Sequence, residues 1–127
     1  MSTSARFPAW AKNIDNTGRK INFDYQNPAY AASIAIATKP QCSKTLVQIT
    51  LTGALTLTIG VGAASTAPYV GDEVEFLIKS DANIRVVTFS TGFQPAGTLS
   101  TVANKTVSAR FMFDGTGWQE MNRAIQA

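Results

Sequence analysis

The sequence predicts an all-β protein: an antiparallel, jelly-roll-like β-sandwich of about eight strands with an extended N-terminal arm. Three observations predict this class. Apolar and polar residues alternate over many short runs, turn residues such as Gly, Asp, Asn and Pro separate these runs, and no stretch has the period of a helix. A length of 127 residues suits one domain. We therefore expect the arm over residues 1–19 and the β-sandwich domain over residues 20–127.

The arm is predicted because the first residues show neither a strand period nor a helix period. Pro8 interrupts the one apolar cluster, which contains Phe7 and Trp10. Since an aromatic pair in a polar segment is poorly placed in water, we expect these two rings to dock on a protein surface. That surface is either the chain's own β-domain or another subunit or partner protein. The candidate contact residues of the arm are Arg6, Phe7, Trp10 and Lys12.

The first predicted strand covers residues 20–25, where apolar and polar residues alternate. Phe23 and Tyr25 share its apolar face, and we expect that face to point inward. Asp24 lies on the other, polar face. Small and branched residues alternate in a second predicted strand over residues 32–37, which can therefore lie close to another backbone.

The clearest predicted β-hairpin covers residues 45–59. Residues 47–51 and 55–59 both alternate apolar residues with Thr or Gln, and Gly53-Ala54 separates the two runs. A tight turn between two alternating runs is typical of a hairpin. Further strands are expected over residues 71–79, 84–89, 98–102, 107–113 and 118–121.

Histidine, the commonest general base in protein catalysis, is missing from the chain. The chain also has only one cysteine, Cys42, so neither a Ser-His-Asp triad nor an internal disulfide can form. Asp72, Glu73 and Glu75 lie close together in the sequence, but their spacing is more typical of a solvated strand edge than of a cation site. We therefore expect no catalytic residue, no metal and no cofactor.

The distribution of charge and the hydropathy argue against nucleic-acid and membrane partners. The net charge is +3, but the basic residues are scattered and form no stripe, so we expect no nucleic-acid binding. No apolar stretch is long enough for a signal peptide or a membrane span. The expectation is a chain that is made and folded in the cytoplasm and has no membrane partner.

One segment resembles a known group of proteins. From Gly71 to Met121 the chain combines a Gly-Asp turn before an aliphatic strand, several short strands and loops, and a final Phe-x-Phe-Asp-Gly-Thr-x-Trp run. In order, these features are Gly71-Asp72-Glu73-Val74, Arg85-Val86-Val87-Thr88-Phe89, Gly92-Phe93, Gly97-Thr98-Leu99, Asn104-Lys105 and Phe111 to Trp118. The segment resembles the β-sandwich domains of tailed-phage virion proteins, which occur in head fibres, capsid decoration proteins and tail-fibre tips.

The resemblance implies a homotrimer without enzyme activity. The chain has no long repetitive shaft, which a receptor-binding fibre needs, and it has a short aromatic arm that could lie on a capsid lattice. We therefore expect a capsid decoration or head-fibre protein on the capsid surface of the virion, reached after synthesis in the host cytoplasm. Its expected partners are two further copies of itself and the major capsid protein.

The alternative is a tail-fibre or baseplate tip domain that binds a host receptor or a glycan. In that case the contact surface would be the loops over residues 60–70 and 90–97. Tyr69 and Phe93 would be the candidate stacking residues in these loops.

Overall fold

The computed structural model describes residues 23–39, 41–62, 67–94 and 96–126. The predicted arm over residues 1–19 lies outside these residues. The described part of the chain consists of strands and connecting segments and contains no helix, so the predicted all-β class is confirmed. The strands are β1 (Phe23–Gln26), β2 (Ser33–Ile36), β3 (Lys44–Thr50), β4 (Leu55–Ile59), β5 (Glu73–Lys79), β6 (Val86–Phe89), β7 (Phe93–Gln94), β8 (Gly97–Ser100), β9 (Thr106–Phe113) and β10 (Trp118–Ile125).

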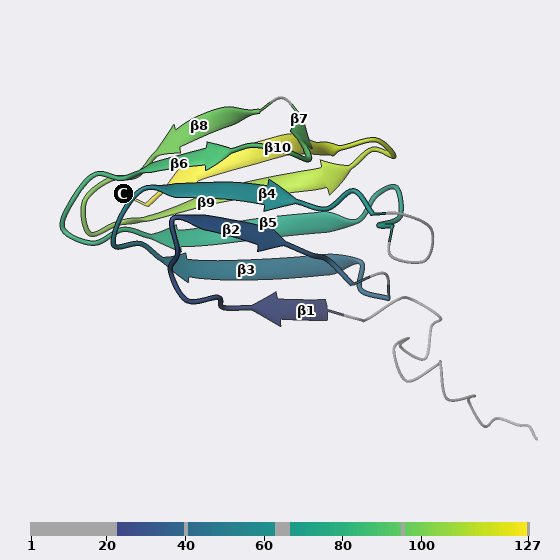
Figure 1. Ribbon diagram of the computed structural model, residues 1–127, viewed down its shortest axis with the longest axis horizontal. Coiled ribbons are helices and arrows are strands. Elements are labelled where there is room, and N and C mark those ends of the chain that lie inside the picture. The colour runs from purple at the N-terminus through teal and green to yellow at the C-terminus, as the bar shows by residue number, and fades with distance from the viewer. Residues whose placement is uncertain (1–22, 40, 63–66, 95, 127) are drawn as a thin grey trace, which may run out of the picture.

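The strands form two sheets that lie one over the other (Figure 1). One sheet has six strands in the order β1-β3-β5-β9-β10-β7, and the other has four strands in the order β2-β4-β6-β8. From β1 to β6 the chain changes sheet after every strand. Each return to a sheet therefore follows two crossings, and β1, β3 and β5 run parallel, as do β2, β4 and β6.

Antiparallel pairing occurs only among the later strands. β9 pairs with β5 and β10, and β8 pairs with β6. Of the eight strand pairings in the described residues, five are parallel. The expected antiparallel, jelly-roll-like arrangement is therefore not confirmed. An alternating sequence identifies the two faces of a strand, but it does not specify the direction of the neighbouring strand.

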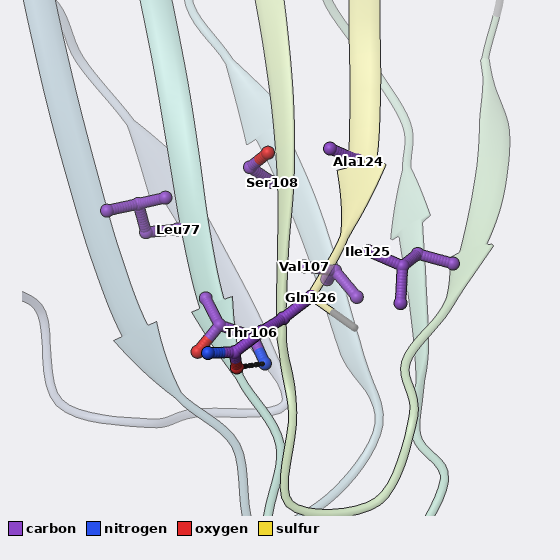
Figure 2. Close-up of a pocket in the computed structure, with 7 residues that line it drawn as sticks. All are labelled: Leu77, Thr106, Val107, Ser108, Ala124, Ile125 and Gln126. Atoms are coloured by element: carbon purple, nitrogen blue, oxygen red, sulfur yellow. Dashed lines mark hydrogen bonds between the residues drawn. The ribbon is translucent and has the colours of Figure 1, made fainter.

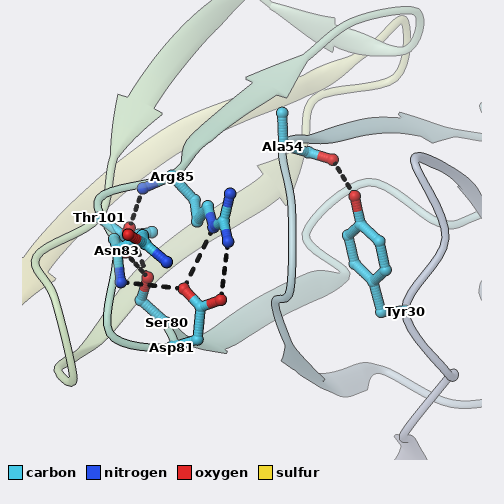
Figure 3. A network of polar contacts seen from close by, with 7 residues as sticks. All are labelled: Tyr30, Ala54, Ser80, Asp81, Asn83, Arg85 and Thr101. Atoms are coloured by element: carbon cyan, nitrogen blue, oxygen red, sulfur yellow. Dashed lines mark hydrogen bonds and ion pairs between the residues drawn. The ribbon is translucent and has the colours of Figure 1, made fainter.

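The hairpin predicted over residues 45–59 is wrong, because β3 and β4 lie in different sheets. A two-residue hairpin needs a positive φ at its glycine, and Gly53 does not have one. Gly53 instead lies against Tyr30, whose hydroxyl would collide with any Cβ at this position. The same hydroxyl donates a hydrogen bond of 2.6 Å to the carbonyl oxygen of Ala54 (Figure 3). The glycine therefore permits close packing at the point where the chain crosses between the sheets.

A polar network holds the crossing from β5 to β6 (Figure 3). Nε and Nη2 of Arg85 donate to the carboxylate of Asp81 at 3.1 and 2.8 Å, and the Asn83 backbone N–H donates to the same carboxylate at 3.1 Å. The hydrogen bonds from Arg85 hold the pKa of Asp81 at about 2. Beneath this pair, the buried hydroxyls of Ser80 and Thr101 are joined at 2.9 Å.

The core lies between the two sheets and contains a cluster of phenylalanine rings. Phe76 of β5 meets Phe89 of β6 across the sheets, with ring centroids 6.0 Å apart. Phe93 and Phe111 join the same cluster, and their own centroids are 4.8 Å apart. Ring pairs at such separations contribute about 0.5–1.5 kcal/mol each beyond the area that they bury. The cluster therefore fixes the two sheets against each other.

The first strand faces the opposite way from the prediction. Phe23 and Tyr25 are 54% and 51% exposed, whereas Asp24 is buried. The Asp24 carboxylate accepts a hydrogen bond of 2.9 Å from Gln26 Nε2 and lies 3.3 Å from Lys39 Nζ. These two partners satisfy the buried charge. Since β1 is an edge strand, an inward carboxylate also hinders the pairing of another strand with this edge.

Candidate functional site

The six-stranded sheet has an outer face that no other described element covers. The four-stranded sheet packs on the opposite, inner face (Figure 1). Along β3, β5 and β9, buried inner residues alternate with half-buried or exposed outer residues. Three apolar residues of the outer face, Leu46, Leu77 and Met112, are half-buried even without a cover. This face therefore carries more apolar side chains than a sheet surface that faces only water normally does.

Charges of both signs lie on the outer face. The strand register places Lys44 opposite Glu73 and Glu75 opposite Arg110. Opposite charges at facing positions of neighbouring strands stabilise a sheet by about 0.2–1 kcal/mol per pair. With Lys79, the face carries three cations and two anions, so its net charge is close to zero.

Two aromatic side chains lie at one edge of the outer face. Phe23 and Tyr25 project from β1 on this side, and each is more than half exposed. The Tyr25 hydroxyl donates a hydrogen bond of 2.9 Å to Gln48 Oε1 on the neighbouring strand. The register places Tyr25 beside Leu46, so the apolar surface continues from the edge toward the centre of the sheet.

A shallow depression lies at one end of the outer face (Figure 2). The short side chains of Ser108 and Ala124 face each other on β9 and β10. Together with Leu77 and Ile125 they line a space of about 300 Å³. No lining residue of this depression carries a titratable side chain, so the site offers packing and not acid–base chemistry.

A second depression, which we call the Met hollow, lies at the opposite end of β9 and β10. Its lining is mostly apolar, and its volume is about 270 Å³. The strand register shifts between Glu120 and Asn122, so Met121 has no partner on β9 and projects outward, 53% exposed. The lining residues are Val70, Gly71, Met112, Phe113, Asp114, Gln119 and Met121.

The rim of the Met hollow carries a negative charge. The carboxylate of Asp114 accepts the backbone N–H groups of Thr116 and Gly117 at 2.9 Å each and Gln119 Nε2 at 2.8 Å. These hydrogen bonds, those from the backbone above all, hold the pKa of Asp114 at about 2. Asp114 is therefore ionised at neutral pH. Glu73 lies opposite Met112 in the register and is a second anion near the hollow.

The residues predicted as site residues have three different outcomes. Arg6, Phe7, Trp10 and Lys12 lie outside the described residues. Tyr69 is 64% exposed. Phe93, in contrast, is only 4% exposed and belongs to the core ring cluster, so its prediction as an exposed stacking residue is wrong. Phe93 is buried because β7 pairs with β10, opposite Trp118.

The acidic residues near the start of β5 show no metal-binding arrangement. Asp72 is buried, and its carboxylate accepts the Tyr69 backbone N–H at 3.0 Å, which holds a turn. Among the described residues, no group of three or more His, Cys, Asp or Glu side chains could hold a metal ion. The same part of the chain contains no helix long and apolar enough to cross a membrane.

Reasoning from the sequence did not identify the Met hollow. Met112 and Met121 lie nine positions apart and on different strands, and only the pairing of β9 with β10 brings them to one site. Val70 comes from a third segment, just before β5. No motif within a single segment marks the three together.

Comparison with known proteins provides no relative from which a function could be transferred. No protein-family model matches the chain, and none of the curated proteins is significantly similar to it.

Proposed function

We propose that the protein is a non-enzymatic structural protein of a tailed-phage virion, attached to the outer capsid surface as a capsid decoration or head-fibre protein. The proposal takes the two stacked sheets as a β-sandwich, the domain type that the resemblance of residues 71–121 implies. Two further copies of the chain and the major capsid protein are the proposed partners.

The observation that carries the proposal is the outer face of the six-stranded sheet. Leu46 and Leu77 lie among a nearly neutral set of charges on this face. A mixture of apolar and paired charged residues is typical of subunit contacts, in which the apolar residues exclude water and the charges set the orientation. A nearly neutral face that carries apolar residues can lie against another copy of the chain without net charge repulsion. We therefore place the contact between copies of this chain on the outer face.

Oligomer formation also explains how weak single contacts could hold the protein on a capsid. Three linked copies make three attachments at once, and after the first contact the others form at a high effective concentration. The affinity of the whole then exceeds that of one contact without any additional type of interaction.

Light scattering on the purified chain tests the subunit contact. We expect a mass of about three times the chain mass of 13.6 kDa. Leu77→Lys should lower this mass toward that of one chain, because it replaces an apolar residue of the outer face with a charge. Val86→Lys is the control, since Val86 is an exposed apolar residue of the four-stranded sheet. A monomeric wild-type chain, or equal masses for both variants, would contradict the contact.

Immunogold labelling of intact particles from the source of the chain tests the virion assignment. Antibodies against the protein should label the heads of tailed particles. Labelling of tail tips would favour the second candidate, a tip domain that binds a receptor or a glycan. A sample in which no particle is labelled would contradict both.

The second candidate rests on the exposed segment before β5. Tyr69 and Val70 are 64% and 73% exposed, and Val70 lines the Met hollow. An exposed aromatic ring beside a depression can stack on a sugar ring. Glycan-array binding that is lost in Tyr69→Ala would support this candidate, and binding that persists in that variant would remove Tyr69 from it.

A further inference from the structure

The Met hollow lies in line with Phe23, the first residue of β1. The register places Phe23 opposite Lys44, Lys44 opposite Glu73 and Glu73 opposite Met112. These residues form one straight row across the outer face, from the first residue of β1 to the lining of the hollow. Neighbouring strands are about 4.8 Å apart, so the row is about 14 Å long.

The segment before β1 is long enough to reach the hollow. Twelve residues separate Trp10 from Phe23. An extended chain of that length spans up to about 40 Å, nearly three times the length of the row. The aromatic pair Phe7 and Trp10 can therefore reach Met112 and Met121 of the same chain without a fully extended connection.

The chemistry of the hollow matches that of the arm. Methionine side chains are flexible and make favourable contacts with aromatic rings, and the hollow exposes Met121 together with Met112. Arg6 and Lys12 flank the aromatic pair in the sequence. The anions Asp114 and Glu73 lie at and beside the hollow. The hollow thus offers apolar side chains and anions, and the arm sequence contains aromatic residues and cations.

We propose that the Met hollow is the docking site of this chain's own arm, with the ring of Trp10 against Met112 and Met121. The short connection to β1 favours the arm of the same copy, because the local concentration of a tethered segment is in the millimolar range. The inference goes beyond the proposed function and does not depend on it, since the arm can dock whether or not the protein belongs to a virion.

Tryptophan fluorescence of the full chain tests the proposal. The chain has two tryptophans, Trp10 and Trp118. Trp118 is fully buried and donates Nε1–H to the carbonyl oxygen of Gly60 at 3.1 Å, so its signal reports on the folded β-domain. Subtracting the emission of Trp10→Phe from that of the wild type isolates the signal of Trp10. We expect this signal to be blue-shifted and several-fold less quenched by acrylamide than in the unfolded chain.

Two matched variants connect this protection to the hollow. Met121→Lys should return Trp10 to solvent and raise its quenching to the level of the unfolded chain. Ile125→Lys is the control, because Ile125 lies on the same strand and is 52% exposed, against 53% for Met121, but lines the other depression. The Trp118 signal of each variant, measured with Trp10→Phe, shows that the β-domain remains folded.

Each result decides for or against the proposal. Protection of Trp10 that is independent of protein concentration, lost in Met121→Lys and kept in Ile125→Lys supports it. A Trp10 that is fully quenched in the wild type overturns it. Protection that persists in Met121→Lys also overturns it, since the ring would then lie elsewhere. Protection that disappears on dilution would place the arm on another copy and would overturn docking within one chain.

Discussion

The hydroxyl of Tyr30 donates a hydrogen bond of 2.6 Å to the backbone carbonyl of Ala54 and occupies the space into which a side chain at position 53 would project. This contact joins the segment before β2 to the crossing between the two sheets. The crossing therefore depends on a glycine because of a neighbour that is distant in the sequence and not because of a positive φ.

We expect Gly53→Ala to destabilise the protein by about 1–3 kcal/mol, because the new methyl group must displace the Tyr30 ring. Chemical denaturation measures this change in the free energy of unfolding. Gly97→Ala is the control, since no atom lies within 4 Å of a Cβ at that position. Equal effects of the two substitutions would show that the contact with Tyr30 does not restrict position 53.

Phe93→Ala should lower the free energy of unfolding by about 3–5 kcal/mol, as expected for removal of a buried aromatic side chain. The ring packs against Phe76, Phe89 and Phe111. Tyr69→Ala, at an exposed position, should change stability by about 0.5 kcal/mol or less. Thermal or chemical unfolding of the two variants distinguishes a core residue from a surface residue. A small loss in Phe93→Ala would contradict the position of β7 in the core.

The stability of the fold should fall as the pH drops from about 4 to about 2. Hydrogen bonds lower the pKa of Asp81 and of Asp114 from 3.8 to about 2 in the folded protein. A depressed pKa contributes stability above the unfolded value, and this contribution disappears as protons bind to the folded form. Denaturation midpoints measured between pH 5 and pH 2 should therefore decline. The decline should be smaller in Asp81→Asn and Asp114→Asn, and an unchanged slope in both would refute this origin.

Replacing Asp24 with valine should promote association through the edge of the six-stranded sheet. The substitution removes the inward carboxylate from β1 and leaves an open edge strand that a second chain can pair with. Light scattering over a range of concentrations should show larger species than in the wild type. Asp24→Asn keeps a polar inward group and serves as the control. If both variants behave as the wild type, Asp24 does not protect this edge.

Much of the local structure follows from alternation in the sequence. Residues 47–51, 55–59 and 74–78 alternate as predicted, and their apolar members form the buried side of β3, β4 and β5. The all-β class follows for the same reason, because no stretch offers a helix an apolar side. The Met hollow could not be predicted in this way, since its residues come from separate segments.

The positions of most strands and the side of each that is apolar follow from the order of the residues, because a period of two depends only on neighbouring residues. Which strands pair, in which direction and in which sheet depends instead on contacts between residues far apart in the chain. A run such as residues 45–59 suits a hairpin and a crossing between sheets equally well. The contact of Tyr30 with Gly53 is compatible with the crossing that the chain adopts. The inward side of β1 was decided in the same way, by the partners that Gln26 and Lys39 offer to Asp24.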